Sequence, residues 1–417
     1  MRFTLSEQQT LIEDSALDFL TRTQDPGHRR YGNDADPLAP RLWPAFAEMG
    51  WLGLPLPEAC GGFGGGAMDT GLLMRAFGRH GVNAPYHSGI VLAARLLAEL
   101  GTVRQRAQWL PAIVDGERRI ALAHDEPQCH SPWAARHTHA VREGTGWRLH
   151  GVKLLVAGGP GAHALLVSAR MAGTDPGRHA LFLLPLSSDA TDSAAGLRLQ
   201  TCRMADGAMA ADVCLDGVRV GDEALLGVPD SGAGIGPIDL IDHIHDSAPA
   251  LHRILAEGLI ALCWEACGAM QAALNLTVSH TSQREQFGRT IASFQVVQHR
   301  LAEMAVCCEE AQAACELAAM RVDGGAPGVL AAASMAKSKV GRAARFVAQE
   351  AVQLHGAMGV SEALPVASLF RKLTQFQQQG GATAWHSAQL GARLLGSGGW
   401  RDSQTLLNAT AMDTATL

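Results

Sequence analysis

The hydrophobic period changes twice along the 417 residues, and this change limits the fold more than any other feature. Residues 1–118 place apolar side chains at helical spacing, with glycine after most of the predicted helices. From Arg119 the apolar runs become short, rich in valine and leucine, and separated by turn residues. Helical spacing returns after "GVPDSGAGIG" and continues to about Gly396. This order predicts helices, then a small antiparallel β-barrel or sandwich, then a helical bundle.

The length agrees with this division, because 417 residues exceed what one ordinary hydrophobic core contains. We predict an N-terminal helical domain over residues 1–118, a middle β-domain over residues 119–236 and a C-terminal helical domain over residues 237–417. The predicted fold class is α+β.

Composition narrows the range of partners. The chain is 47% apolar and 18% charged, as in a globular protein, and its net charge of −6 offers no basic surface for nucleic acid or an anionic membrane. No apolar run approaches the roughly 20 residues that span a bilayer. The first predicted helix is acidic and amphipathic, unlike a signal peptide. We therefore expect a cytoplasmic protein.

Side chains that ligate metals are present but poorly arranged for a metal site. The nine cysteines include no C-x-x-C pair, which favours reduced, apolar fillers over a zinc site or a disulfide framework. Asp239, Asp242, His243, His245 and Asp246 lie close together in the sequence. Side chains two positions apart on a helix point in different directions, however, so this cluster does not converge. We predict a polar linker there and no metal.

Four stretches of the sequence, taken in order, resemble the acyl-CoA dehydrogenase family. They are "EMGWLGLPLPEACGGFGG", "DEP", "REQFG" followed by "FQVVQ", and "QLHGAMGVSEALPVASLFRKL". The resemblance covers essentially the whole chain and implies a β-barrel domain between an N-terminal helical domain and a C-terminal four-helix bundle. It also implies the family's reaction, in which a glutamate removes the α-proton of an acyl-CoA thioester while the β-hydrogen leaves as hydride to FAD.

The resemblance assigns one set of residues to the ADP half of FAD. In this family the flavin ring rests on one chain, while helices of the neighbouring chain hold the ADP half. Arg284 would clamp the diphosphate with its planar charged fork, and two phenylalanines would pack about the adenosine. Considered without the resemblance, Arg284 and Gln295 are solvated residues on a helix face. The full set is Arg284, Phe287, Phe294, Gln295, Gln353, Gly356 and Ala357.

The family's catalytic glutamate is missing from both of its usual positions. Nine residues after Arg371, where the resemblance places it, the chain has Gly380. The second family position, on the helix before the R-x-x-F-G motif, falls on Gly258. Glu257 is adjacent, but one residue turns a side chain by about 100° around a helix. Glu257 is therefore a weak candidate for the base, and we predict no other catalytic residue.

The positions expected beside the flavin ring also depart from the family pattern. Asp125 replaces the threonine of the family's T-E-P motif, although Glu126 and Pro127 remain. An aspartate near the pyrimidine edge of a flavin would oppose the negative charge of the reduced ring. The residues that stand where the family has W-I-T are Leu155, Val156 and Ala157.

This imbalance resembles the small subunit of heteromeric family members, in which two different chains form an α2β2 assembly, as in pimeloyl-CoA and steroid side-chain dehydrogenases. One chain there carries the base and the ring-binding residues, and the other supplies the adenine-side clamp. The resemblance implies FAD shared with a homologous partner chain or a second copy. The alternatives are a homomeric dehydrogenase that uses Glu257, a flavin monooxygenase on the same fold, and a flavin-free structural protein.

Overall fold

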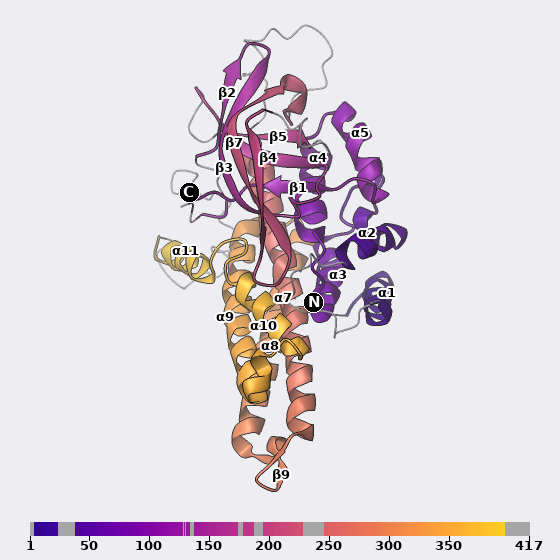
Figure 1. Cartoon of the computed structure of the whole chain (residues 1–417), viewed down its shortest axis with the longest axis vertical. Helices are drawn as coiled ribbons and strands as arrows, with labels where there is room; N and C mark the ends of the chain where they lie inside the picture. The colour runs from indigo at the N-terminus through magenta and orange to yellow at the C-terminus, as the bar shows by residue number, and fades with distance from the viewer. Residues whose placement is uncertain are drawn as a thin grey trace.

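The computed structural model describes residues 4–23, 38–127, 129, 131–133, 137–173, 178–186, 195–227 and 246–396. In Figure 1 a curled sheet lies above a bundle of long helices, and the N-terminal helices lie along one side. The N-terminal elements are α1 (Glu7–Thr23), α2 (Leu38–Glu48), the short 3-10 helices η2 (Trp51–Gly53) and η3 (Glu58–Cys60), α3 (Ala67–His80), the π-helix η4 (His87–Ala94), α4 (Arg95–Leu100) and α5 (Val103–Val114).

The sheet begins six residues after α5. Its strands are β1 (Ile120–Ala123), β2 (His139–Glu143), β3 (Gly146–Ala157), β4 (Ala164–Met171), β5 (His179–Pro185), β6 (Leu197–Arg203) and β7 (Met209–Gly221), followed by the 3-10 helix η5 (Asp222–Ala224). The strand order is β1-β4-β2-β3-β7-β6, and β5 pairs with β4. Its core is a separate cluster of small and branched apolar side chains around Trp147 and Phe182.

The C-terminal elements form the helical bundle. They are α7 (Ala248–Gln283), the hairpin strands β8 (Glu285–Gln286) and β9 (Arg289–Thr290), η6 (Ile291–Ser293), α8 (Gln295–Asp323), α9 (Val329–His355), η7 (Gly356–Val360), α10 (Pro365–Phe376) and α11 (Thr383–Gly396). The hairpin lies at the end of the bundle farthest from the sheet (Figure 1). Four helices, α7 to α10, pack against one another, and α11 packs on α9.

Small residues allow helix α3 to cross α7 closely. A Cβ atom added to Gly78 of α3 would lie 1.8 Å from the carbonyl oxygen of Glu265, and one added to Gly268 of α7 would lie 1.9 Å from that of Arg75. Such distances are far inside van der Waals contact, so the two backbones touch where a side chain is missing. This contact joins the N-terminal helices to the bundle.

Helix α7 has the length and the apolar composition to cross a membrane, and it is the one helix among the described residues that does. The bundle explains this composition, because 72% of the apolar window is buried inside the protein. A helix that is apolar on nearly all sides is expected in the core of a large domain.

The predicted order of helical domain, curled β-domain and helical bundle is confirmed. The sheet differs in one respect from the antiparallel barrel that was expected, because β1 and β2 both pair with β4 in parallel. Parallel pairs need crossover connections, which strand periodicity alone does not reveal. Of the predicted polar linker, residues 239–245 lie outside the described residues. Asp246 accepts hydrogen bonds from the backbone N–H groups of Ala248 (3.0 Å) and His179 (3.1 Å).

Candidate functional site

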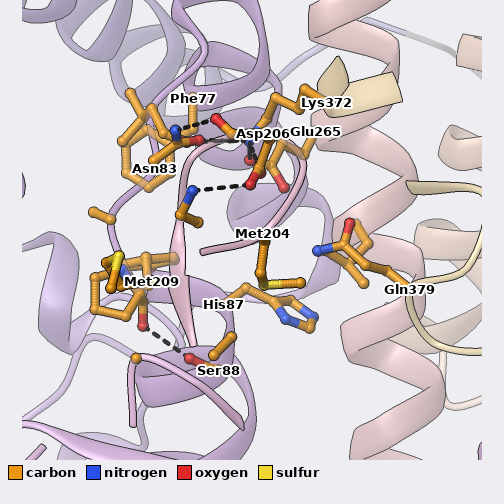
Figure 2. Close-up of a pocket in the computed structure, with 18 of the residues that line it drawn as sticks. Phe77, Asn83, His87, Ser88, Met204, Asp206, Met209, Glu265, Lys372 and Gln379 are labelled. Carbon is orange, nitrogen blue, oxygen red and sulfur yellow. Dashed lines mark hydrogen bonds and ion pairs between the residues drawn. The ribbon is translucent and has the colours of Figure 1, made fainter. Parts of the chain in front are cut away.

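Two adjoining cavities lie where the N-terminal helices, the sheet and the bundle meet. The larger has a volume of about 550 Å³ and the smaller about 330 Å³. Helices α7 and α10, the start of η4 and the end of β3 contribute to both walls. Figure 2 shows the smaller cavity, with polar groups from Asn83, Asp206, Glu265 and Lys372 gathered at one end. Cavities of this size and position are the usual sites of small-molecule binding.

Gly380 lies in the wall of the larger cavity, at the position where the resemblance expects the catalytic glutamate. Its φ of 63° is left-handed, a conformation that glycine adopts without strain. Buried polar groups hold the segment that contains it. The Lys337 ammonium donates to the carbonyl oxygens of Phe376 and Gln379, and a ring nitrogen of His386 lies 2.9 Å from the carbonyl oxygen of Gly380. The position is thus well ordered but carries no acid or base.

The second family position, Gly258, lines neither cavity but packs against Leu92 and His87 of the wall of the larger one. A Cβ atom added there would lie 2.4 Å from Leu92 and 3.1 Å from the Nε2 atom of His87. The neighbouring Glu257 is buried and forms ion pairs with Arg95 and Arg253. Glu257 lines neither cavity. Its carboxylate oxygens are occupied by two guanidinium groups and lie outside both cavities, so this placement argues against Glu257 as the base.

Asp125 is the one carboxylate of the described residues that lines the larger cavity. Its side chain is accessible to solvent inside that cavity, yet the surrounding protein raises the pKa of its carboxyl group above the ordinary value. Lys153 acts in the opposite direction, and Glu126 adds to the rise. The sequence placed Asp125 beside a flavin, and the structure places it in a cavity that also contains Leu155.

The end of β3 bends into the larger cavity. The pairing of β3 with β7 shifts its register between Lys153 and Val156, which marks a β-bulge. Leu155 lies within this bulge with a φ of 50°, which is rare for a branched side chain, and its N–H donates to Asp212 (2.9 Å). A strained residue at a cavity wall is a frequent sign of a functional site. The three residues at the expected W-I-T positions, Leu155, Val156 and Ala157, thus line the larger cavity with aliphatic groups.

A buried ion pair supports the floor of this site. The Lys153 ammonium lies 2.8 Å from the Glu126 carboxylate, and neither side chain has any solvent exposure. Lys153 also donates to the carbonyl oxygen of His124 (3.1 Å) and to the Ser168 hydroxyl (3.1 Å). Burial acts to raise the pKa of Glu126, but Lys153 and the hydrogen bonds to Glu126 outweigh burial and lower that pKa to about 2. The pair thus fixes the segment that carries Asp125.

Buried histidines beside the larger cavity predict a loss of stability in mild acid. Burial lowers the pKa of His124 to about 3 and that of His386 to about 4. In the unfolded chain both pKa values return to about 6.5, so below this pH the unfolded state binds more protons. We expect the free energy of unfolding to fall as the pH falls from 6.5 to 4, by up to about 1.4 kcal/mol per pH unit for each histidine.

Urea unfolding at a series of pH values from 7 to 4.5 measures this slope. His386→Gln is expected to reduce the slope by up to about 1.4 kcal/mol per pH unit, because one of the buried imidazoles is removed. The exposed His299, in α8, provides the matched control, and His299→Gln should leave the slope unchanged. An unaltered slope in His386→Gln would contradict the prediction.

The residues assigned to ADP lie at the opposite end of the bundle, around the β8–β9 hairpin. Arg284 is exposed, and none of the acidic side chains in the described ranges lies within ion-pair distance of it. Phe287 is 90% exposed and has a φ of 56° at the tip of the hairpin. Phe287 and Phe294 meet edge to face with ring centroids 6.2 Å apart, and the Arg289 guanidinium lies 4.1 Å from the Phe294 ring centroid. Gln295 begins helix α8 and is exposed.

The second ADP segment reaches the same end of the bundle from α9. Gln353, Gly356 and Ala357 are all exposed there, and Gly356 has φ 62° and ψ −143°, a backbone conformation available almost only to glycine. The rings of His280 and His355 stack with centroids 4.4 Å apart and join the end of α7 to the end of α9. Sequence reasoning did not find this stack, because the two histidines are far apart in the chain.

The cavity and the hairpin are too far apart to serve one bound FAD. Gly258 lies in the first third of α7 and Arg284 directly follows its last residue, and 26 residues at the helical rise of 1.5 Å separate the two by about 39 Å. An extended FAD molecule is shorter than this. The cavity and the hairpin of one protomer therefore cannot contact the same FAD molecule.

The fold and the cavity together define the class of this protein. A helical domain, a curled sheet and a four-helix bundle that meet at one cavity form the acyl-CoA dehydrogenase fold. The acyl-CoA dehydrogenase N-terminal domain matches residues 6–117, and the acyl-CoA dehydrogenase C-terminal domain matches residues 249–395.

Individual relatives agree with this assignment. Acyl-CoA dehydrogenase FadE12 of Mycobacterium tuberculosis is 30% identical over 344 residues, which cover 79% of this chain and 81% of that protein. The structure of a variant of the Tcur3481-Tcur3483 steroid ACAD is 30% identical with a TM-score of 0.77, covering 94% of this chain and 99% of that one. Glutaryl-CoA dehydrogenase from Mycobacterium smegmatis is 25% identical with a TM-score of 0.81, covering 95% and 97%. The chain belongs to the acyl-CoA dehydrogenase family.

Proposed function

We propose that this chain is the non-catalytic subunit of a heteromeric, FAD-dependent acyl-CoA dehydrogenase. In this proposal a homologous partner carries the base and the flavin-ring contacts, and this chain supplies the ADP-side clamp of the shared FAD site. The observation that carries the proposal is glycine at both family positions for the base, Gly380 and Gly258, in a chain that keeps the exposed Arg284. We also propose a cytoplasmic location.

The hairpin end of the bundle fits the ADP half of FAD. A guanidinium that forms no ion pair with the described acidic side chains, as at Arg284, suits a diphosphate, because the planar fork donates two parallel hydrogen bonds to phosphate oxygens. Phe287 offers an exposed ring that can stack on an adenine, and the half-buried Phe294 supports it edge to face. The backbone at Gly356 is open to solvent, because no atom lies within 4 Å of a Cβ added there. A phosphate group therefore has room to approach it.

The cavity end fits the flavin ring poorly. The aliphatic side chains of Leu155 and Ala157 line this cavity at the positions where the resemblance expects the family's aromatic and hydroxyl contacts. Asp125 adds a carboxylate where a reduced flavin gathers negative charge, and like charges repel strongly in a site with little water. When its ring is bound, FAD accepts the hydride. We infer that the ring is bound by the partner, and that this chain orients the cofactor through its diphosphate and adenosine.

The comparison with the steroid ACAD supports the heteromeric proposal. Its name joins two components, and this chain matches one of its chains almost end to end. A shared site also agrees with the separation of about 39 Å between Gly258 and Arg284, because an ADP clamp that cannot reach its own cavity must serve another chain. The same separation is compatible with a homo-oligomer, so the missing base decides between the two.

Asp125 favours a second candidate, a homomeric enzyme that removes the α-proton with this aspartate. A base for this reaction needs a raised pKa and access to the substrate, and the Asp125 carboxyl group has both. One observation opposes this candidate. Asp125 lies in the sheet domain, whereas both of the family's base positions, Gly258 and Gly380, lie in the helical bundle domain. Asp125→Asn separates the two candidates in a turnover assay of the purified chain.

Flavin retention provides a direct test of the shared site. We expect the chain purified alone to be nearly colourless, and the chain purified with a homologue that carries the family's glutamate and W-I-T residues to retain FAD. The visible absorption band of flavin, followed by release of FAD on denaturation, measures the stoichiometry. One FAD per chain in the protein purified alone would contradict the proposal. A complex without flavin would favour the structural alternative.

A further inference from the structure

The two cavities share part of their wall, and two side chains in that shared wall keep hydrogen-bonding atoms that the protein does not use. His87 and Gln379 line both cavities. Figure 2 shows the His87 imidazole and the Gln379 amide turned toward the same space, beside Met204. The two residues come from different parts of the chain, since His87 begins η4 and Gln379 follows α10.

His87 presents an acceptor to this space. Its Nε2 atom lies 2.9 Å from the carbonyl oxygen of Gly258, which can only accept, so Nε2 carries the hydrogen. Burial lowers the pKa of His87 to about 4, and the imidazole is therefore neutral at physiological pH. A neutral imidazole with a protonated Nε2 has an Nδ1 lone pair, and no polar group of the described residues bonds to Nδ1.

The position of His87 is firmly set by its neighbours. Tyr86 donates its hydroxyl to the carbonyl oxygen of Trp51 (2.9 Å) and packs edge-on against Phe77. A π-helix, rare in proteins and frequent at functional sites, starts at His87. On the opposite side, Gly258 leaves the space that the imidazole occupies, because a Cβ atom there would lie 3.1 Å from Nε2.

Gln379 presents both a donor and an acceptor. Its backbone carbonyl accepts a hydrogen bond from Lys337 (2.9 Å), which holds the residue in place. Its side-chain amide has no hydrogen-bond partner among the residues that the structure describes. An amide placed this way can donate to a ligand oxygen or accept from a ligand hydroxyl.

The surroundings favour an uncharged ligand. The formal charges of the side chains that line the smaller cavity cancel. They are two carboxylates, Asp206 and Glu265, and two cations, Lys372 and Arg119. Lys372 lies 2.7 Å from Glu265 and is satisfied there. In the larger cavity the Asp125 carboxylate opposes an anion. Most of the remaining lining is apolar, which favours a ligand with a hydrocarbon body.

We propose that the shared wall of the two cavities binds an uncharged, mainly apolar molecule through a hydroxyl group held between His87 and Gln379. The hydroxyl donates to His87 Nδ1 and accepts from the Gln379 amide, a pair of contacts that a ketone, an ether or a carboxylate cannot make. The proposal is independent of the proposed function, because it concerns neither FAD nor the partner chain.

Octan-4-ol and octan-4-one form a matched pair of probes that differ in the hydroxyl donor alone. Isothermal titration calorimetry on the full chain, without flavin or partner, measures both dissociation constants. We expect the alcohol to bind about fivefold to tenfold more tightly than the ketone, because only the alcohol pairs the buried Nδ1 acceptor. Equal affinities, or no binding of either probe, would overturn the proposal.

Two substitutions at His87 test which atom makes the difference. The amide nitrogen of His87→Gln replaces the Nε2 donor to Gly258 but leaves no acceptor at Nδ1, so the preference for the alcohol should fall to within about twofold. In His87→Asn the amide oxygen replaces Nδ1, and the preference should persist. Gln379→Leu should weaken the alcohol and the ketone alike. A preference that survives His87→Gln in a folded variant, judged by its thermal midpoint, would assign the hydroxyl to another residue.

Discussion

Arg284→Ala in this chain is expected to lower the FAD affinity of the complex by about 10-fold to 100-fold. The guanidinium is exposed at the end of α7 and has no acidic partner in the described ranges, so its charge is available to a diphosphate. A charge-assisted hydrogen bond is worth about 1.5–3 kcal/mol, and each 1.4 kcal/mol is a factor of ten. Fluorescence titration of FAD into flavin-depleted complex measures the change.

Two further variants sharpen this prediction. Arg284→Lys keeps the charge but loses the planar fork, so its FAD affinity should lie between those of the unaltered protein and Arg284→Ala. Arg219 in the sheet is 75% exposed and distant from the hairpin, and Arg219→Ala is the matched control with no expected effect. If Arg284→Ala binds FAD as tightly as the control, the hairpin does not hold the diphosphate.

Lys153→Met is expected to reduce the free energy of unfolding by about 3–5 kcal/mol at pH 7, since it leaves the buried charge of Glu126 without its partner. Methionine fills nearly the same volume, so the effect comes from the charge. The backbone N–H groups of His137 (2.7 Å) and Thr138 (2.9 Å) remain as the donors to the Glu126 carboxylate.

Urea unfolding at two pH values checks the cause of this loss. Without Lys153 the pKa of Glu126 rises from about 2, and protonation of the carboxyl group relieves the penalty in acid. The cost of Lys153→Met should therefore be smaller at pH 4.5 than at pH 7. Lys339→Met, at a half-exposed ion pair with Glu310, is the control and should cost less than about 1 kcal/mol. Equal costs for the two lysines would contradict the prediction.

The order of the domains and the positions of the family's sequence motifs could be predicted from the sequence. Periodicity distinguished the helical regions from the strands, and the R-x-x-F-G motif marked the end of the long helix, where the structure forms the hairpin that joins α7 to α8. The lack of a base at both family positions could also be predicted, because Gly258 and Gly380 have no side chain that could accept a proton. These inferences depend on contacts within a short segment of the chain.

The walls of the cavities could not be predicted, because they depend on contacts between distant segments. His87 approaches Gly258 across 171 positions of the sequence, and the π-helix that starts at His87 has no recognised sequence pattern. The parallel pairing of β1 with β4 likewise depends on how a crossover connection folds. Glu257 was a weak candidate for the base in the sequence, and the structure places it between Arg95 and Arg253.

Turnover of an acyl-CoA by the purified chain, with FAD added and an artificial electron acceptor present, tests the central claim most directly. The account predicts that the chain alone oxidises the thioester at least about 100-fold more slowly than its complex with a glutamate-bearing homologue, because general-base catalysis is missing. Rapid turnover by the chain alone, abolished by Asp125→Asn or by Glu257→Gln, would show that one of these carboxylates removes the proton and would contradict the account.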